Sequence, residues 1–246
     1  MKNLKERILL LLFISLFLKS QGQTQTFQPY KSGIILYEGY SFPIVPGTEA
    51  WKSIHHSQRV TSLQLPADTL QNISTARLLE TCLYYPFNID IFAFDDQMDS
   101  FRRVKNQFNG YAELYQRTDY VQQLMSLYNS RSVAFVDQII IDYDRGLYAF
   151  DFKIMEFMLS DAAILASDTQ AAQIVVSILE KMEQKAQNPV YGNTNRIPIG
   201  LTIGRCLQHT NTFSDYQGST LQSFLQSGKL SNPADLDYIF NKTKTM

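Results

Sequence analysis

The sequence is poor in the residues that most often build metal centres, disulfide scaffolds and nucleophilic sites. Three histidines and two cysteines occur in 246 residues. Two cysteines exclude a disulfide-rich scaffold, which needs several bridges. G-x-S-x-G, H-E-x-x-H and glycine-rich phosphate loops are also absent. We therefore expect no cofactor, no metal site and no catalytic residue that a motif would identify, and a non-enzymatic role is favoured.

The sequence also has no excess of basic residues. It contains 22 Lys and Arg against 23 Asp and Glu. Residues 1–22 hold four of the basic residues and one of the acids, so the remaining chain has a formal charge of about −4. Nucleic-acid binding needs a basic stripe or patch that matches the phosphates. Nucleic acid is therefore not expected as a partner.

A hydrophobic run long enough to cross a membrane is missing. The longest is the stretch from Ile8 to Leu18. As a helix it would measure about 16 Å, whereas the hydrocarbon layer is about 30 Å thick. Basic residues precede this run, and the small residues Ser20 and Gly22 follow it. This order is typical of a secretory signal peptide over residues 1–22, cut before Gln23. We expect a periplasmic or extracellular protein without a stable membrane span after cleavage.

Residues 23–47 lack a helical period. Gly39, Pro43 and Pro46 interrupt a stretch rich in aromatic and β-branched residues. Proline and glycine disfavour both a helix and a central strand. We expect a loose lead-in to about Lys31, followed by an extended arm that packs across the helices with at most one short strand.

What the sequence contains instead is a series of helical patterns after Gly47. Apolar residues recur at i, i+3, i+4 and i+7, the spacing of amphipathic helices. Helices are expected over residues 48–54, 66–73, 74–84, 95–108, 111–117, 119–128, 146–159, 169–186, 198–209, 219–226 and 233–242. The segment 133–141 fits a helix or turn better than a strand. We predict a single all-α domain over residues 48–246, either an irregular multi-helix bundle or a HEAT-like stack of helix pairs.

The two cysteines, Cys82 and Cys206, lie on apolar faces of predicted helices. Buried free thiols are the preferred interpretation, because reduced cysteine behaves as a small apolar residue. A disulfide between Cys82 and Cys206 is the alternative, since an oxidising compartment permits one long-range bridge.

The histidines offer weak candidates for chemistry. His55 and His56 are adjacent, so on a helix their side chains point about 100° apart and cannot bind one metal ion from the same face. A cysteine–histidine hydrolase site could be formed by Cys206 and His209, three residues apart, or by Cys82 with His55 or His56. The thiol is disfavoured as a nucleophile on an apolar face. Solvated surface histidines are the preferred interpretation.

Two groups of acidic residues are candidates for a site. Asp90, Asp95, Asp96 and Asp99 flank the start of a predicted helix, where an aspartate can cap the first turn. The sequence Asp-Tyr-Asp-Arg-Gly over residues 142–146 resembles the start of a calcium loop but lacks its later ligands, so a turn before a helix explains it. Glycoside hydrolysis needs two carboxylates about 5 to 9 Å apart, and no pair stands out.

The aromatic residues around Pro86 are too dense to face one way on a single helix. They are Tyr84, Tyr85, Phe87, Phe92 and Phe94. Some of them could form an exposed patch that binds a protein or stacks on a carbohydrate. The alternative is that the segment is a buried connector between two helices.

The stretch LLETCLYYPFNIDIFAFDD (residues 78–96), with Phe101 and the Phe-Asn-Gly triplet at 108–110, resembles a family of exported all-helical proteins of Gram-negative bacteria. The resemblance is centred on residues 74–110. It implies export and an all-α fold. The family has no assigned activity, so the resemblance adds no site residue.

Two hypotheses about function follow. The favoured one is a binding or structural module of the cell envelope, with a helical surface for a protein or glycan partner. The second is an exported hydrolase whose carboxylates, or whose cysteine and histidine, converge only in the fold. The hydrolase requires a cleft that holds acidic side chains with shifted pKa values, whereas the binding module does not.

Overall fold

The computed structural model describes residues 27–93, 96–192, 196–209, 213 and 218–244. All regular structure in these residues is helical and contains no strand, so the all-α prediction is confirmed. The α-helices are α2 (Glu49–Lys52), α3 (His56–Ser62), α4 (Ala67–Asn72), α5 (Thr75–Leu83), α6 (Gln97–Gln107), α7 (Asn109–Leu114), α8 (Tyr120–Ser130), α9 (Asp142–Leu165), α10 (Asp168–Ala186), α11 (Arg196–Gln208), α12 (Ser219–Ser227) and α13 (Pro233–Thr243). The 3-10 helices are η1 (Pro86–Phe92), η2 (Val133–Gln138) and η3 (Pro189–Tyr191). The predicted signal peptide lies outside the described residues.

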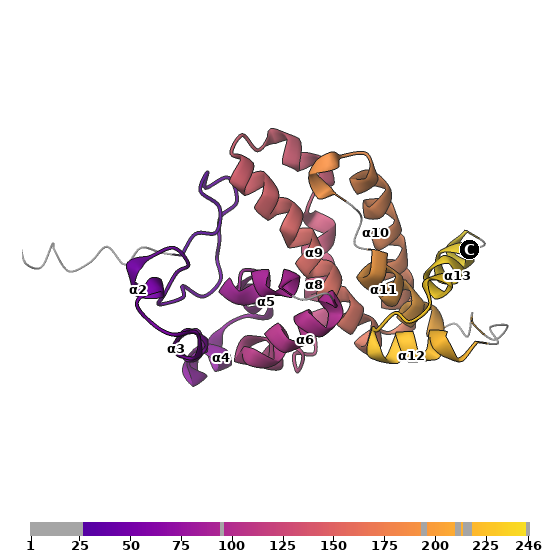
Figure 1. The fold of residues 1–246 in the computed structure, drawn as a ribbon, viewed down its shortest axis with the longest axis horizontal. Helices are drawn as coiled ribbons and strands as arrows, with labels where there is room; N and C mark the ends of the chain where they lie inside the picture. Colours follow the sequence, from indigo (N-terminus) through magenta and orange to yellow (C-terminus); the bar gives the residue numbers. More distant parts are fainter. Residues whose placement is uncertain (1–26, 94–95, 193–195, 210–212, 214–217, 245–246) are drawn as a thin grey trace, which may run out of the picture.

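Helix α9 is the centre of an irregular multi-helix bundle (Figure 1). It packs against α5, α8, α10 and α11 and against η2 and η3. Every residue from Ile154 to Ser160 is buried. A helix that is enclosed in this way must be covered on all sides by other elements. Among the described residues, no helix is both long enough and apolar enough to cross a membrane.

Helix α9 begins earlier and ends later than the sequence pattern predicted. It starts at Asp142 and ends at Leu165, so the sequence Asp-Tyr-Asp-Arg-Gly is its first turn and not a separate turn. Asp142 and Asp144 suit that position, because carboxylates interact favourably with the N-terminal end of a helix. Gly146 lies inside the helix, where glycine costs about 1 kcal/mol relative to alanine but is tolerated.

Residues 27–47 cross one side of the bundle without forming a helix or strand. We call this segment the arm; in Figure 1 it is the indigo segment beside α5 and the first turns of α9. Its aromatic side chains Phe27, Tyr30, Tyr37 and Phe42 are buried. The loose lead-in expected up to Lys31 is therefore wrong for its described part, because Phe27 and Tyr30 belong to the core.

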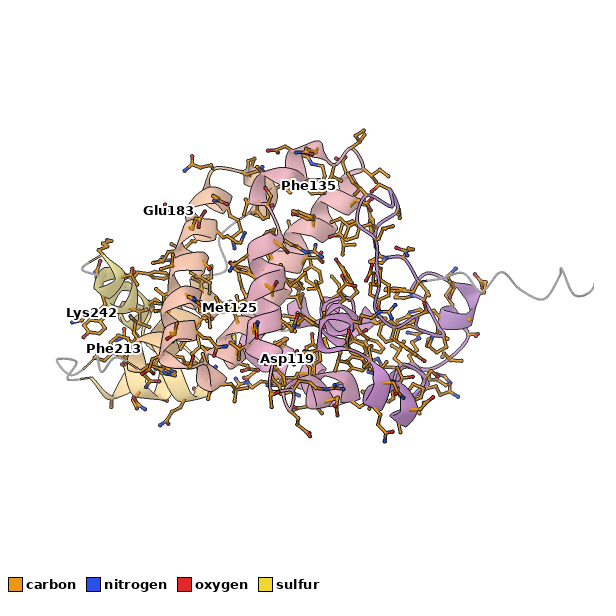
Figure 2. The ribbon with its side chains drawn as sticks, turned by 180° about the vertical axis from the view of Figure 1, so that it is seen from behind. Asp119, Met125, Phe135, Glu183, Phe213 and Lys242 are labelled. Atoms are coloured by element: carbon orange, nitrogen blue, oxygen red, sulfur yellow. The ribbon has the colours of Figure 1, made fainter. Side chains whose placement is uncertain are left out.

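Local signals in the sequence set several helix boundaries. Ser74 caps α5 by accepting a hydrogen bond from the backbone N–H of Arg77, and Thr48 caps α2 in the same way. Asp119 precedes α8, but its side chain makes no cap hydrogen bond; its carboxylate instead accepts a hydrogen bond from the Thr75 hydroxyl at 2.7 Å. The segment 133–141 forms the 3-10 helix η2 over its first six residues and continues without helix or strand over residues 139–141. Phe135 of η2, labelled in Figure 2, packs on Tyr148 near the start of α9 with 5.5 Å between ring centroids.

The C-terminal helices pack on α11 at the end of the molecule opposite the arm. Phe213 and Lys242 mark this end in Figure 2. A side chain at Gly200 would come within 2.4 Å of Leu236, and one at Gly204 would come within 2.4 Å of Leu225. These two glycines, four residues apart on α11, allow α12 and α13 to pack closely against it.

Candidate functional site

A groove of about 880 Å³ lies between the arm, η1 and the first half of α9. One wall is a single face of α9, because residues three or four apart lie on the same side of a helix. Its residues are Tyr143, Gly146, Leu147, Phe150 and Lys153. Ile89 and Phe92 of η1 and Val45 and Pro46 of the arm line the groove from other sides, and buried residues such as Leu83, Tyr84 and Ala149 form its floor.

The rim of the groove carries apolar side chains that are open to solvent. Ile89 is 61% exposed, Tyr143 is 55% exposed and Phe92 is 39% exposed. The Phe92 ring of η1 packs on the Phe150 ring of α9, with 5.4 Å between ring centroids. Single exposed apolar residues are common on protein surfaces, but several gathered in one concave site are typical of a binding surface.

Two lysines are the cationic groups of the lining. The Lys31 ammonium lies 4.1 Å from the centre of the Tyr143 ring, and the Lys153 ammonium lies 5.4 Å from the centre of the Phe92 ring. Both are cation–π contacts. Within the described part of the chain, neither ammonium has a carboxylate within ion-pair distance. The one acidic residue of the lining, Asp142, lies 3.8 Å from Arg145 and is almost fully exposed.

A buried charged cluster lies behind the floor of the groove. The Arg131 guanidinium donates to the Asp151 carboxylate at 2.6 Å and to the Tyr84 hydroxyl at 2.7 Å. The Tyr84 and Tyr30 hydroxyls also donate to Asp151. Burial acts to lower the pKa of Arg131, but Asp151 and the two tyrosines outweigh it, so that this pKa lies above its ordinary value. The cluster therefore ties the arm to α5, α8 and α9 through a guanidinium that stays charged.

A second buried pair lies further along α9. Glu156 pairs with Lys185 of α10 and accepts a hydrogen bond from the Tyr128 hydroxyl at 3.2 Å. Both charged side chains are almost completely buried. Neither residue lines the groove, so the pair joins helices α8, α9 and α10 and does not face a ligand site.

The predicted aromatic patch is mostly core. Tyr84, Tyr85 and Phe87 are buried, and Tyr85 stacks on Phe108 with 4.2 Å between ring centroids. Phe87 therefore belongs to the core alone, whereas Tyr84 and Tyr85 are buried but line the floor of the groove. Phe92 does contribute to the rim of the groove, whereas Phe94 lies outside the described residues.

The histidines and cysteines do not converge. Both cysteines are free and buried, and burial raises the pKa of the Cys206 thiol to about 12. His55 precedes α3, the His56 ring lies 4.9 Å from the Phe87 ring, and His209 lies 3.2 Å from Asp168. The described residues hold no group of three His, Cys, Asp or Glu side chains that could bind a metal ion.

Three of the acidic candidates, Asp96, Asp99 and Asp144, have structural roles. Asp96 caps α6 by accepting from the backbone N–H of Asp99, and Asp99 pairs with Arg102 at 2.5 Å. Burial raises the pKa of Asp90, although nearby His56 acts in the opposite direction. Asp95 lies outside the described residues. Asp144 accepts the backbone N–H groups of the arm, as described below.

The groove residues on α9 were missed at the sequence level, although a signal for them exists. The predicted helix begins at Gly146 and therefore leaves out Tyr143, the first residue of the stripe that runs to Lys153 on one face of α9. Asp151 on α9 and Lys185 on α10 are charged residues on the apolar faces of their helices. A charge in such a position indicates a buried partner of opposite charge.

Comparison with protein-family models, with curated proteins and with solved structures finds no match to this chain.

Proposed function

We propose that this protein is an exported binding module of the cell envelope and that its groove takes an apolar segment of a protein partner. The observation that carries the proposal is the concave apolar site itself. Its volume of about 880 Å³ is within the range of about 300–1,000 Å³ that is usual for ligand sites. The signal-like sequence of residues 1–22 and the resemblance over residues 74–110 support the assignment to the envelope.

The lining favours a protein segment over a glycan. A sugar needs several hydrogen-bonding side chains around it, but those that the lining leaves unengaged, such as Gln28, Lys31 and Tyr143, lie at its exposed rim, and most of the lining is apolar. The Asn88 amide, by contrast, is already engaged, since it donates to the carbonyls of Cys82 and Leu83 and accepts from the Tyr111 hydroxyl. Apolar and aromatic side chains of a peptide would instead bury the exposed surfaces of Ile89, Phe92 and Tyr143.

Gly146 offers a way to close the groove without disturbing the fold. It lines the groove, and a Cβ added there has no neighbour within 4 Å. Gly146→Trp should therefore fill the site while it removes a helix-destabilising glycine from α9. Val176→Trp on α10 is the matched control, because Val176 is 66% exposed and lies outside the groove.

The test is selection of a random dodecapeptide phage library on the purified protein. We expect peptides with an apolar core to be enriched on the native protein and on Val176→Trp, and at least tenfold weaker binding of these peptides to Gly146→Trp. Equal binding to all three proteins, or no enrichment on the native protein, would contradict the proposal. Export is tested separately. The intact mass of the protein recovered from the periplasm should correspond to a chain without residues 1–22.

A further inference from the structure

The two lysines of the groove lie toward opposite ends of its α9 wall. Lys31 stacks on Tyr143, at the start of that wall, and Lys153 lies at its other end. Ten residues separate Tyr143 from Lys153, which corresponds to about 15 Å along the helix axis. The apolar surface of Leu147 and Phe150 lies between them. The groove is thus an apolar strip with a cation at each end.

Both cations are available to a ligand. Their ammonium groups contact aromatic rings, and in the described residues neither forms an ion pair with a carboxylate. The Asp144 carboxylate, which holds the Lys31 backbone, interacts with the Lys31 charge from beyond ion-pair distance. The acid of the lining, Asp142, is near the Lys31 end, but its carboxylate is almost fully exposed and lies nearest Arg145. The chemistry that complements this arrangement is an apolar segment with a negative charge at each end.

We propose that the groove recognises an extended peptide segment in which an apolar block of about four residues is flanked by an acidic residue on each side. This inference rests on the proposed function and adds the chemistry of the partner. An extended chain advances about 3.3 Å per residue, so acids five positions apart match the length of the α9 wall from Tyr143 to Lys153. A fatty acid has one charged end and could satisfy only one of them, which is why we favour a peptide.

The test uses three synthetic peptides that differ only at their ends. The acidic probe is acetyl-Asp-Leu-Phe-Leu-Phe-Asp followed by Ser-Gly-Ser-amide, and the matched probes carry Asn or Lys in place of both Asp residues. Binding is measured by calorimetry at 50 mM and 500 mM salt, with laurate as a lipid probe. The proteins are the native chain, the double variant Lys31→Glu with Lys153→Glu, and Gly146→Trp.

We expect the acidic peptide to bind the native protein about 3- to 30-fold more tightly than the Asn peptide, the effect of two solvent-exposed ion pairs. This preference should shrink at 500 mM salt, because salt screens exposed charges. The double variant should prefer the Lys peptide, which a merely structural role of the lysines would not produce. Gly146→Trp should weaken all peptides that bind.

Other outcomes separate the two proposals. Equal binding of the Asp and Asn peptides, lost in Gly146→Trp, would overturn the charge rule and leave the groove as a peptide site. Binding of laurate without any peptide would overturn the inference in favour of a lipid. If no probe binds and the phage selection also fails, the proposed function itself is overturned together with the inference.

Discussion

The two halves of helix α9 have opposite environments on one continuous element. From Ile154 to Ser160 the helix is enclosed by α8, α10 and α11, and all seven of these residues are buried. From Tyr143 to Lys153 the same helix has one face against the arm and the core, and another face along the open groove. The second half is therefore apolar because it forms the core, whereas the exposed apolar face of the first half has no such explanation within the chain.

The two halves of α9 also differ in the surroundings of their charged side chains. In the enclosed half, Glu156 is paired with Lys185 and both are removed from water. At the groove, the ammonium groups of Lys31 and Lys153 lie over aromatic rings and form no ion pair within the described residues. A buried charge needs a partner for the fold to be stable, whereas a charge at a rim is free to meet a ligand.

The largest effect is expected from breaking the pair in the enclosed half. Lys185→Met leaves the Glu156 carboxylate buried without its cation, which should lower the free energy of unfolding by about 3–5 kcal/mol. Urea unfolding followed by circular dichroism measures this. Lys52→Met is the matched control, because the Lys52–Glu49 pair is solvent-exposed and its loss should cost less than about 1 kcal/mol.

A second variant separates the charge from the packing. Replacing both partners, with Glu156→Leu and Lys185→Met, should restore most of the lost stability, because no uncompensated charge remains. A double variant as unstable as Lys185→Met alone would show that the pair is needed for packing and not for neutralisation.

One substitution made in both halves of α9 sharpens the comparison. Leu159 is 1% exposed, and Leu159→Ala should destabilise the protein by about 2–5 kcal/mol, since it removes buried methyl groups and leaves a cavity. Leu147 lines the groove and is only partly buried, so Leu147→Ala should cost about 1 kcal/mol or less. The helix propensity change is the same at both sites. Equal losses in urea unfolding would mean that both halves are core.

Local sequence signals predicted most of the helices. Ser74, Thr48 and Asp96 could be recognised as caps because a cap acts within three residues of itself. The apolar stripe of α10 was equally clear, and its predicted start at Thr169 is one residue from the observed start at Asp168. Such features depend on neighbours in the chain, which a single sequence contains.

The arm and the groove could not be predicted in the same way, because their contacts join distant parts of the sequence. Tyr30 donates to Asp151, 121 residues away, and no local pattern specifies that pairing. The sequence of η1 also does not indicate which of its apolar residues are buried and which are exposed to solvent. In the structure, Phe87 is covered and Phe92 is not, although only five positions separate them.

The smallest effect, and the most specific, is expected where the first half of α9 holds the arm. The two carboxylate oxygens of Asp144 accept the backbone N–H groups of Lys31 at 2.9 Å and Ser32 at 2.7 Å. In Asp144→Asn only one oxygen remains, so the variant should lose about 1–2 kcal/mol of stability near neutral pH. Asp142→Asn, two positions away, should change little, because Asp142 is exposed and its nearest charged partner is Arg145.

The pH dependence identifies the Asp144 contribution. Burial acts to raise the pKa of Asp144, but the hydrogen bonds from Ser32 and Lys31 outweigh it, so this pKa lies below its ordinary value of 3.8. A carboxyl with a lowered pKa stabilises the fold above its unfolded pKa, and this stabilisation is lost as the pH falls through the folded value. The stability difference between the native protein and Asp144→Asn should thus be constant from pH 5 to 8 and shrink below about pH 4. Amide hydrogen exchange of residues 27–47 should rise in the variant at pH 7. A difference that persists unchanged at pH 2 would show that the carboxylate charge does not hold the arm, and that this wall of the groove depends on packing alone.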